Sequence, residues 1–97
     1  MRTLNLRRLN FRHLQYFWVV AKEEHLTRAA EQLHVAQSAI SSQIRALEQE
    51  LGHELFLRQG RTLRLTEVGR IVLDYAESIF NLGAELLETV QGGDELH

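Results

Sequence analysis

Polar side chains follow one face of the segment from residue 37 to residue 51, and their types suit hydrogen bonding to nucleic acid. At about 100° per residue in a helix, this face lies opposite an apolar stripe. The stripe holds Ile40, Ile44, Leu47 and Leu51, and the polar face holds Ser38, Ser41, Ser42, Arg45 and Gln49, with Gln37 at the helix start. Short serines allow close approach to base pairs, glutamine can pair bidentately with adenine, and arginine can reach guanine or phosphate. The pattern predicts a helix that reads the major groove of DNA.

Four arginines fall between residues 58 and 70, and Glu67 is the only acidic residue among them. A dense basic stretch beside a turn is a candidate for phosphate contacts. Alternating apolar residues on either side of Gly60 predict a short hairpin over residues 55–66. As a wing beside the reading helix, it would carry basic side chains to the DNA backbone or the minor groove. These side chains are Arg58, Arg61 and Arg64.

The elements that must position these side chains follow from apolar spacing. Residues at three- and four-residue steps predict a helix over 10–23, with Asn10 as its N-cap. A short helix is expected over 26–33, followed by a three-residue turn and the helix over 37–51, which Gly52 ends. This order is typical of a helix-turn-helix.

A long helix is predicted over residues 67–90, with Thr66 as its N-cap. Its apolar residues are spaced four and three apart, as in a coiled-coil heptad. They are Val68, Val72, Tyr75, Ile79, Leu82 and Leu86. This seam could pack against the first helix of the same chain or form a dimer interface. We favour the dimer, because the seam exceeds what the first helix could cover.

The charge of the chain is divided by position. The formal net charge is −2, which by itself argues against a nucleic-acid partner. Residues 1–70 hold all eleven basic residues and seven acidic ones, a charge of +4, whereas residues 71–97 hold six acidic residues and no basic one. The acidic total therefore belongs to the long helix and the tail, and the segment expected to face DNA is basic.

Other chemistry finds little support. The chain has no cysteine, and its five histidines show no metal-ligand spacing. Its only aspartates are Asp74 and Asp94, so a Ser-His-Asp triad is not expected. Apolar runs are too short to span a membrane. We therefore expect no enzyme, no metal, no cofactor and no membrane contact.

The segment Leu26–Glu48, LTRAAEQLHVAQSAISSQIRALE, resembles the DNA-binding domain of LysR-type transcriptional regulators. The similarity continues through Leu51-Gly52, Leu55-Phe56, Arg58, Arg61, Leu65-Thr66 and Gly69. The segments HLQYFW (residues 13–18) and LFLRQGR (residues 55–61) are most similar to the NhaR-type branch of the family. The resemblance implies a mainly α fold, with a winged helix-turn-helix and short β-hairpin wing over 1–66. It also implies a linker helix over 67–91 that pairs antiparallel with a second copy, and a frayed tail over 92–97.

The resemblance also implies roles for single residues. Bases or phosphates would be contacted by Gln37, Ser38 and Ser41, phosphate by Thr27 and Arg28, and the minor groove by Arg61. Together with Ser42, Arg45, Arg58 and Arg64, these residues make up the predicted DNA-binding set. Glu48 and Arg58 are expected to form a supporting ion pair. Ser42 and Ser38 depart from the arginine and proline that many members carry, and His25 replaces a usual helix cap, so the cap is expected to weaken or to move to Thr27.

The expected function is sequence-specific binding of double-stranded DNA by a homodimer, in the cytoplasm at the nucleoid. Family members continue into an effector-binding domain, so a small-molecule effector is expected to act only through a part that this chain lacks. We interpret the chain as an excised domain or a gene fragment, with a natural short form also open. The alternative is an interaction module that pairs through the linker helix with a full-length regulator and blocks it.

Overall fold

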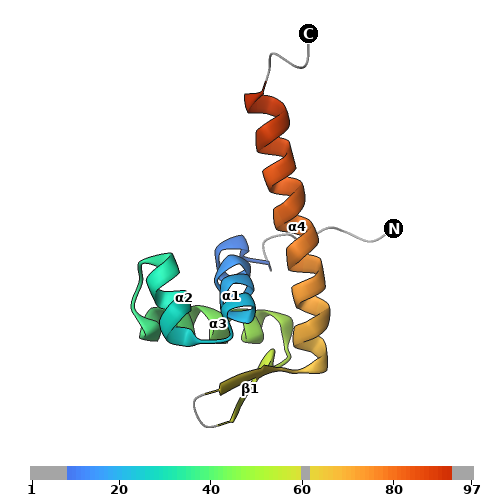
Figure 1. The fold of residues 1–97 in the computed structure, drawn as a ribbon. Helices are drawn as coiled ribbons and strands as arrows, with labels where there is room; N and C mark the ends of the chain where they lie inside the picture. The colour runs from blue at the N-terminus through green and yellow to red at the C-terminus, as the bar shows by residue number, and fades with distance from the viewer. Residues whose placement is uncertain (1–8, 60–61, 93–97) are drawn as a thin grey trace, which may run out of the picture.

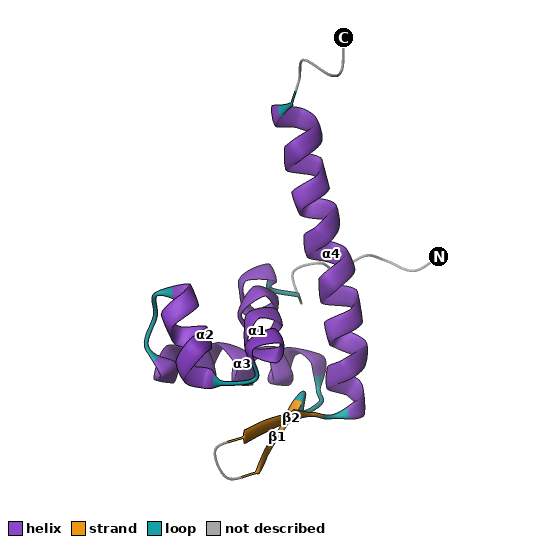
Figure 2. Cartoon of the chain, in the orientation of Figure 1, coloured by secondary structure: helices purple, strands orange, loops and turns teal. Residues whose placement is uncertain are grey.

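The computed structural model describes residues 9–59 and 62–92. The elements are α1 (Phe11–Glu23), α2 (Leu26–Leu33), α3 (Gln37–Leu51), β1 (Phe56–Gln59), β2 (Thr62–Leu65) and α4 (Glu67–Gln91). The first three helices pack together, the hairpin lies beneath them, and α4 runs beside α1 and extends well beyond it (Figure 1). The mainly helical fold with a two-stranded wing is as predicted (Figure 2).

Local capping explains where these helices begin and end. The Asn10 side chain accepts hydrogen bonds from the backbone N–H groups of Arg12 and His13, which confirms it as the N-cap of α1. Gly52 ends α3 in the left-handed conformation, with φ of 76°. Thr66 accepts from the Gly69 N–H at 2.9 Å and begins α4.

The starts of α2 and α3 differ, because no side chain caps them. His25 precedes α2 and Ala36 precedes α3, and neither side chain makes a capping hydrogen bond. Of the two outcomes expected at this cap, the weaker cap is confirmed, because His25 makes no capping hydrogen bond; the shift to Thr27 is wrong, because α2 begins at Leu26. The first N–H groups of a helix have no partner within the helix. These two helix starts therefore keep donors available to a ligand.

The core lies where α1, α2 and α3 meet. Its largest fully buried side chains are Phe17, Val20, Ile40, Leu47 and Leu55. Ala29 and Ala30 are buried in the middle of α2, and α2 packs against both α1 and α3. The apolar stripe predicted for α3 faces this core, which leaves its polar face to solvent.

The hairpin is antiparallel, and its register fixes which side chains share a face. The pairs are Phe56 with Leu65, Leu57 with Arg64, Arg58 with Leu63, and Gln59 with Thr62. Side chains alternate between the faces of a strand. Arg58 therefore shares a face with the half-buried Phe56, Leu63 and Leu65, whereas Arg64 lies on the opposite face beside Leu57.

The apolar seam of α4 is divided between two environments. Val68, Val72 and Ile79 pack against the core. A second set, which we call the exposed stripe of α4, recurs at steps of four, seven and four residues and is at least half exposed. It consists of Tyr75, Leu82 and Leu86 from the predicted seam, together with Ile71, which the prediction did not include. The α1 contact therefore covers only part of the predicted seam. No helix in the described part of the chain is long and apolar enough to cross a membrane.

Candidate nucleic-acid interface

The polar face of α3 is open to solvent. Gln37, Ser38, Ser42 and Arg45 are exposed, and Ser41 is half-buried. The structure therefore keeps these five predicted residues together on the accessible side of one helix. Their hydrogen-bonding atoms need no rearrangement of the core to meet a ligand.

Gln37 and Thr27 meet across the turn between α2 and α3. The Gln37 Nε2 donates a hydrogen bond to the Thr27 Oγ1 at 3.0 Å. This bond joins the first turns of the two helices and restricts the Gln37 side chain before any ligand is present. Two predicted site residues, ten positions apart in sequence, are thereby brought into direct contact. Arg28, the next residue of α2, is exposed.

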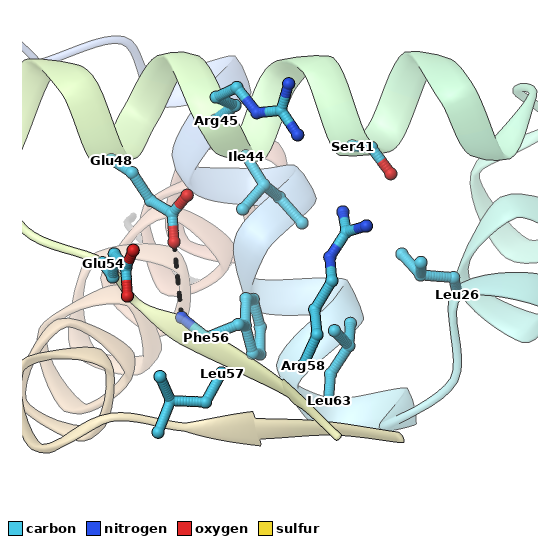
Figure 3. A pocket seen from close by; sticks show the side chains of 10 residues that line it. All are labelled: Leu26, Ser41, Ile44, Arg45, Glu48, Glu54, Phe56, Leu57, Arg58 and Leu63. Carbon is cyan, nitrogen blue, oxygen red and sulfur yellow. Dashed lines mark hydrogen bonds between the residues drawn. The ribbon is translucent and has the colours of Figure 1, made fainter. Parts of the chain in front are cut away.

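A groove separates α3 from the hairpin, and we call it the α3–hairpin groove. Its lining includes Leu26, Ser41, Arg45, Glu48, Arg58 and Leu63. Figure 3 shows Arg58 rising from β1 toward α3 and Ser41, with Arg45 on the helix above. The groove thus combines two guanidinium groups, from two elements, with the carboxylates of Glu48 and Glu54 and several apolar side chains. Arg64 lies outside it and lines a separate hollow with Arg70 and Glu24.

The expected ion pair between Glu48 and Arg58 is wrong. The Glu48 Oε2 instead accepts a hydrogen bond from the Leu55 N–H at 2.7 Å and lies 3.4 Å from the Phe56 nitrogen (Figure 3). In the described ranges 9–59 and 62–92, Lys22 forms an ion pair with Glu77, and the His13 Nδ1 lies within hydrogen-bond distance of the Glu50 Oε1, at 2.6 Å. The physical reason is that Leu55 is fully buried, and its N–H needs an acceptor where the chain enters the hairpin. Arg58 is thus left for a ligand, and Glu48 fixes the hairpin to α3.

Replacing Glu48 with Ala should destabilise the domain, because the Leu55 N–H would lose its acceptor inside the core. The expected cost is about 2 kcal/mol, typical of an unsatisfied buried donor. Urea unfolding followed by circular dichroism measures it. Glu54→Ala is the matched control, since Glu54 is exposed on the same connection and its carboxylate makes no hydrogen bond among the described residues. Equal stability losses in the two variants would contradict this role of Glu48.

The remaining predicted wing residue, Arg61, lies outside the described residues. Sequence reasoning missed three features of the site: the Gln37–Thr27 bond, the attachment of the hairpin through Glu48, and the opposite faces of Arg58 and Arg64. The third could have been found from the alternation of side chains in a hairpin, once its register was fixed.

Proteins with known names resemble this chain in sequence and in fold. The family model for the bacterial regulatory helix-turn-helix protein, lysR family, matches residues 11–70. The chain belongs to the LysR family. Its fold and the sequence resemblance are thereby confirmed, and the LysR-type helix-turn-helix is a DNA-binding domain.

Two LysR-family relatives with curated names show how much of a regulator this chain represents. The transcriptional activator protein NhaR of Escherichia coli (strain K12) is 42% identical over 87 residues, which are 90% of this chain and 29% of NhaR. The HTH-type transcriptional regulator BudR of Klebsiella aerogenes is 42% identical over 84 residues, 87% of this chain and 59% of BudR. The chain thus spans less than a third of NhaR, and both relatives are regulators of transcription.

Solved LysR-family structures agree in fold. The BenM DNA-binding domain in its complex with catB site 1 DNA has a TM-score of 0.80 and 34% identity, over 86% of this chain and 93% of that one. The CbnR DNA-binding domain in complex with DNA has a TM-score of 0.78 and 35% identity, over 89% of this chain and 99% of that one. Both of those domains were solved bound to DNA.

Proposed function

We propose that this LysR-family domain binds double-stranded DNA sequence-specifically as a homodimer, with α3 in the major groove and the wing at the minor groove. The observation that carries the proposal is the exposed polar face of α3, which continues into the α3–hairpin groove with its two guanidinium groups. The DNA complexes of the BenM and CbnR domains support the choice of ligand.

Base recognition would come from the start of α3. With its amide N–H on Thr27, Gln37 presents a fixed orientation toward a base edge. An amide that need not search rotamers loses less entropy on binding. Ser38, Ser41 and Ser42 are short enough to let the helix backbone approach the bases.

Phosphate contacts would come from the helix starts and from the groove. The uncapped first turn of α2 offers backbone N–H groups and the positive end of the helix dipole, and it carries Thr27 and Arg28. In the α3–hairpin groove, Arg45 and Arg58 would hold the strand that passes from the major to the minor groove. Phosphate contacts of this kind position a protein on the duplex, and base contacts then supply specificity.

The homodimer would form through the exposed stripe of α4. Leaving Ile71, Tyr75, Leu82 and Leu86 in water is unfavourable, and a second copy of the same stripe would bury them. At 1.5 Å per residue, α4 is about 37 Å long, enough to hold two bodies apart along a duplex. This role would place the protein at the nucleoid in the cytoplasm. A small-molecule effector would act through a part of the protein outside this chain.

Arg58 and Arg64, the wing arginines within the described residues, provide the test, because they carry the same charge on opposite faces of one hairpin. Arg58→Ala should weaken binding to a selected duplex by about tenfold and reduce the slope of log affinity against log salt by about one. Arg64→Ala, the matched control, should weaken binding less. Fluorescence anisotropy over a salt series measures both. Equal losses would contradict the role of the groove, and failure of the wild type to bind any duplex at low salt would overturn the proposed function.

The same exposed stripe also favours a second candidate, an interaction module that pairs with the linker helix of a full-length regulator and blocks it. In that case the chain would dimerise but would not bind DNA. Light scattering combined with the anisotropy measurement separates the two functions.

A further inference from the structure

Four side chains join α1 to α4, and we call them the α1–α4 cluster: Trp18, Lys22, Glu77 and Phe80. The rings of Trp18 and Phe80 lie 4.9 Å apart between centroids. The Lys22 Nζ lies 4.9 Å from the centroid of the Trp18 ring and 3.2 Å from the Glu77 Oε1. Trp18 and Lys22 are four residues apart on α1, and Glu77 and Phe80 are three residues apart on α4. Each helix therefore contributes two side chains to the contact.

The electrostatics of the cluster favour this arrangement. The indole N–H of Trp18, followed by the ammonium of Lys22, holds the pKa of the Glu77 carboxyl below its ordinary value. The buried Trp18 Nε1 has no partner with full hydrogen-bond geometry among the described residues, so it acts on the carboxylate as a nearby dipole. The Glu77 carboxylate is charged at neutral pH and attracts Lys22, which also contacts the face of Trp18.

A second contact fixes the start of α4. A Cβ on Gly69 would lie 2.1 Å from the Leu55 carbonyl oxygen, so the backbone of α4 touches the backbone of the hairpin entry here. Glu77 is eight residues further along, about 12 Å at 1.5 Å per residue. The Gly69 contact thus places one point of the α4 axis. The α1–α4 cluster, together with the core packing of Val72 and Ile79, sets the direction of that axis relative to α1.

We infer that the α1–α4 cluster positions the helix-turn-helix on α4 and thereby sets the spacing of half-sites that the dimer accepts. The inference rests on the proposed function, since only a dimer reads two half-sites. The start of α3 lies on the α2 side of the fold, away from α4 (Figure 1), so this end of α3 is displaced from the α4 axis. A rotation of about 10° over an arm of about 20 Å would move α3 by about 3.5 Å, which is about one base-pair step. A small loosening of the cluster is therefore enough to admit neighbouring spacings.

The test compares duplexes that differ only in half-site spacing. The probes are the dyad site that the wild-type chain selects from a random duplex library, the same site lengthened or shortened by one or two base pairs, and a single half-site. The wild type should prefer its selected spacing by about tenfold over the neighbouring ones, because avidity depends on simultaneous engagement. In Glu77→Gln and Lys22→Met this preference should fall to about threefold or less, with affinity for the single half-site unchanged.

Matched variants keep the result specific. Lys22→Arg retains both the ion pair and the contact with the ring, so it should keep the wild-type preference. Glu85→Gln removes the same charge from an exposed position of α4 and should also leave it unchanged. Trp18 is the only tryptophan of the chain, so its emission should shift in Glu77→Gln and Lys22→Met but not in the two controls.

The outcomes separate this inference from the proposed function. An unchanged spacing preference in Glu77→Gln and Lys22→Met would overturn the inference alone. Equal losses of affinity for the dyad site and for the single half-site would also overturn it, because the cluster would then contribute only to the stability of the domain. A wild type that shows no preferred spacing would overturn the dimeric function, and this inference with it.

Discussion

Leu82→Asp should leave the folded monomer intact and weaken binding to a dyad site by about a hundredfold or more, because a charge in the proposed dimer interface costs several kcal/mol to desolvate. Leu82 is 64% exposed in the single chain, so a carboxylate there meets water and disturbs no packing. In a two-fold interface the same patch of both copies takes part. Each dimer would then bury two carboxylates where it had buried two leucines.

Asn81→Asp is the matched control for this variant. Asn81 is the adjacent exposed residue, about 100° around the helix from Leu82 and off the exposed stripe of α4. It adds the same charge with almost no change in shape. Light scattering should show a dimer for Asn81→Asp and a monomer for Leu82→Asp at micromolar concentration, and anisotropy should show loss of dyad binding only in the latter. A dimeric Leu82→Asp would mean that copies pair through another surface.

Gly69→Ala should destabilise the domain by about 3 kcal/mol or more, a large part of the total for a chain of this size. Its added Cβ would lie 2.1 Å from the Leu55 carbonyl oxygen and 3.1 Å from the Leu65 Cδ2. Leu55 cannot withdraw, because its N–H is held by Glu48 and its carbonyl oxygen accepts from the Thr66 N–H at 3.0 Å. The start of α4 would have to move away from the hairpin.

Gly83→Ala is the matched control, because it makes the same substitution in α4 at a position with no steric clash. Nothing lies within 4 Å of a Cβ at Gly83, so the variant should gain up to about 1 kcal/mol from helix propensity alone. Urea unfolding of both variants, at one protein concentration, measures the difference. Similar effects in the two would show that the contact between Gly69 and Leu55 is not tight in solution.

The helices and the hairpin could be predicted because their signals are local. Asn10, Gly52 and Thr66 act within one turn of their own positions, and the spacing of Ile40, Ile44 and Leu47 decides which face of α3 is buried. Such patterns need no knowledge of distant parts of the chain. The same locality made the polar face of α3 predictable, and contact of that face with DNA stays a prediction.

The remaining features depend on tertiary structure. The role of Glu48 depends on the path of residues 52–55. This path directs the buried Leu55 N–H toward the Glu48 carboxylate, whereas Arg58 forms no ion pair with it. The division of the α4 seam depends on which side of α4 faces α1 and the core. Val72 and Ile79 pack on the core, whereas Tyr75, which lies between them along the helix, and Leu82 are exposed on another side. The core-packed and the exposed residues follow the same heptad spacing, so the spacing alone could not show which of them pack on the core.

The first turns of α2 and α3 have no side-chain cap, so a change that stabilises the unbound domain there could weaken its binding to DNA. A serine or aspartate at residue 25 would add a capping hydrogen bond worth about 1 kcal/mol to the unbound domain. The same oxygen would occupy the N–H groups that the proposed phosphate contact uses, and an aspartate would also repel the phosphate. A more stable LysR domain and a tighter DNA binder therefore call for different residues at one position. Histidine leaves those amides open in the unbound domain, so that in the proposed complex DNA would supply part of the stability.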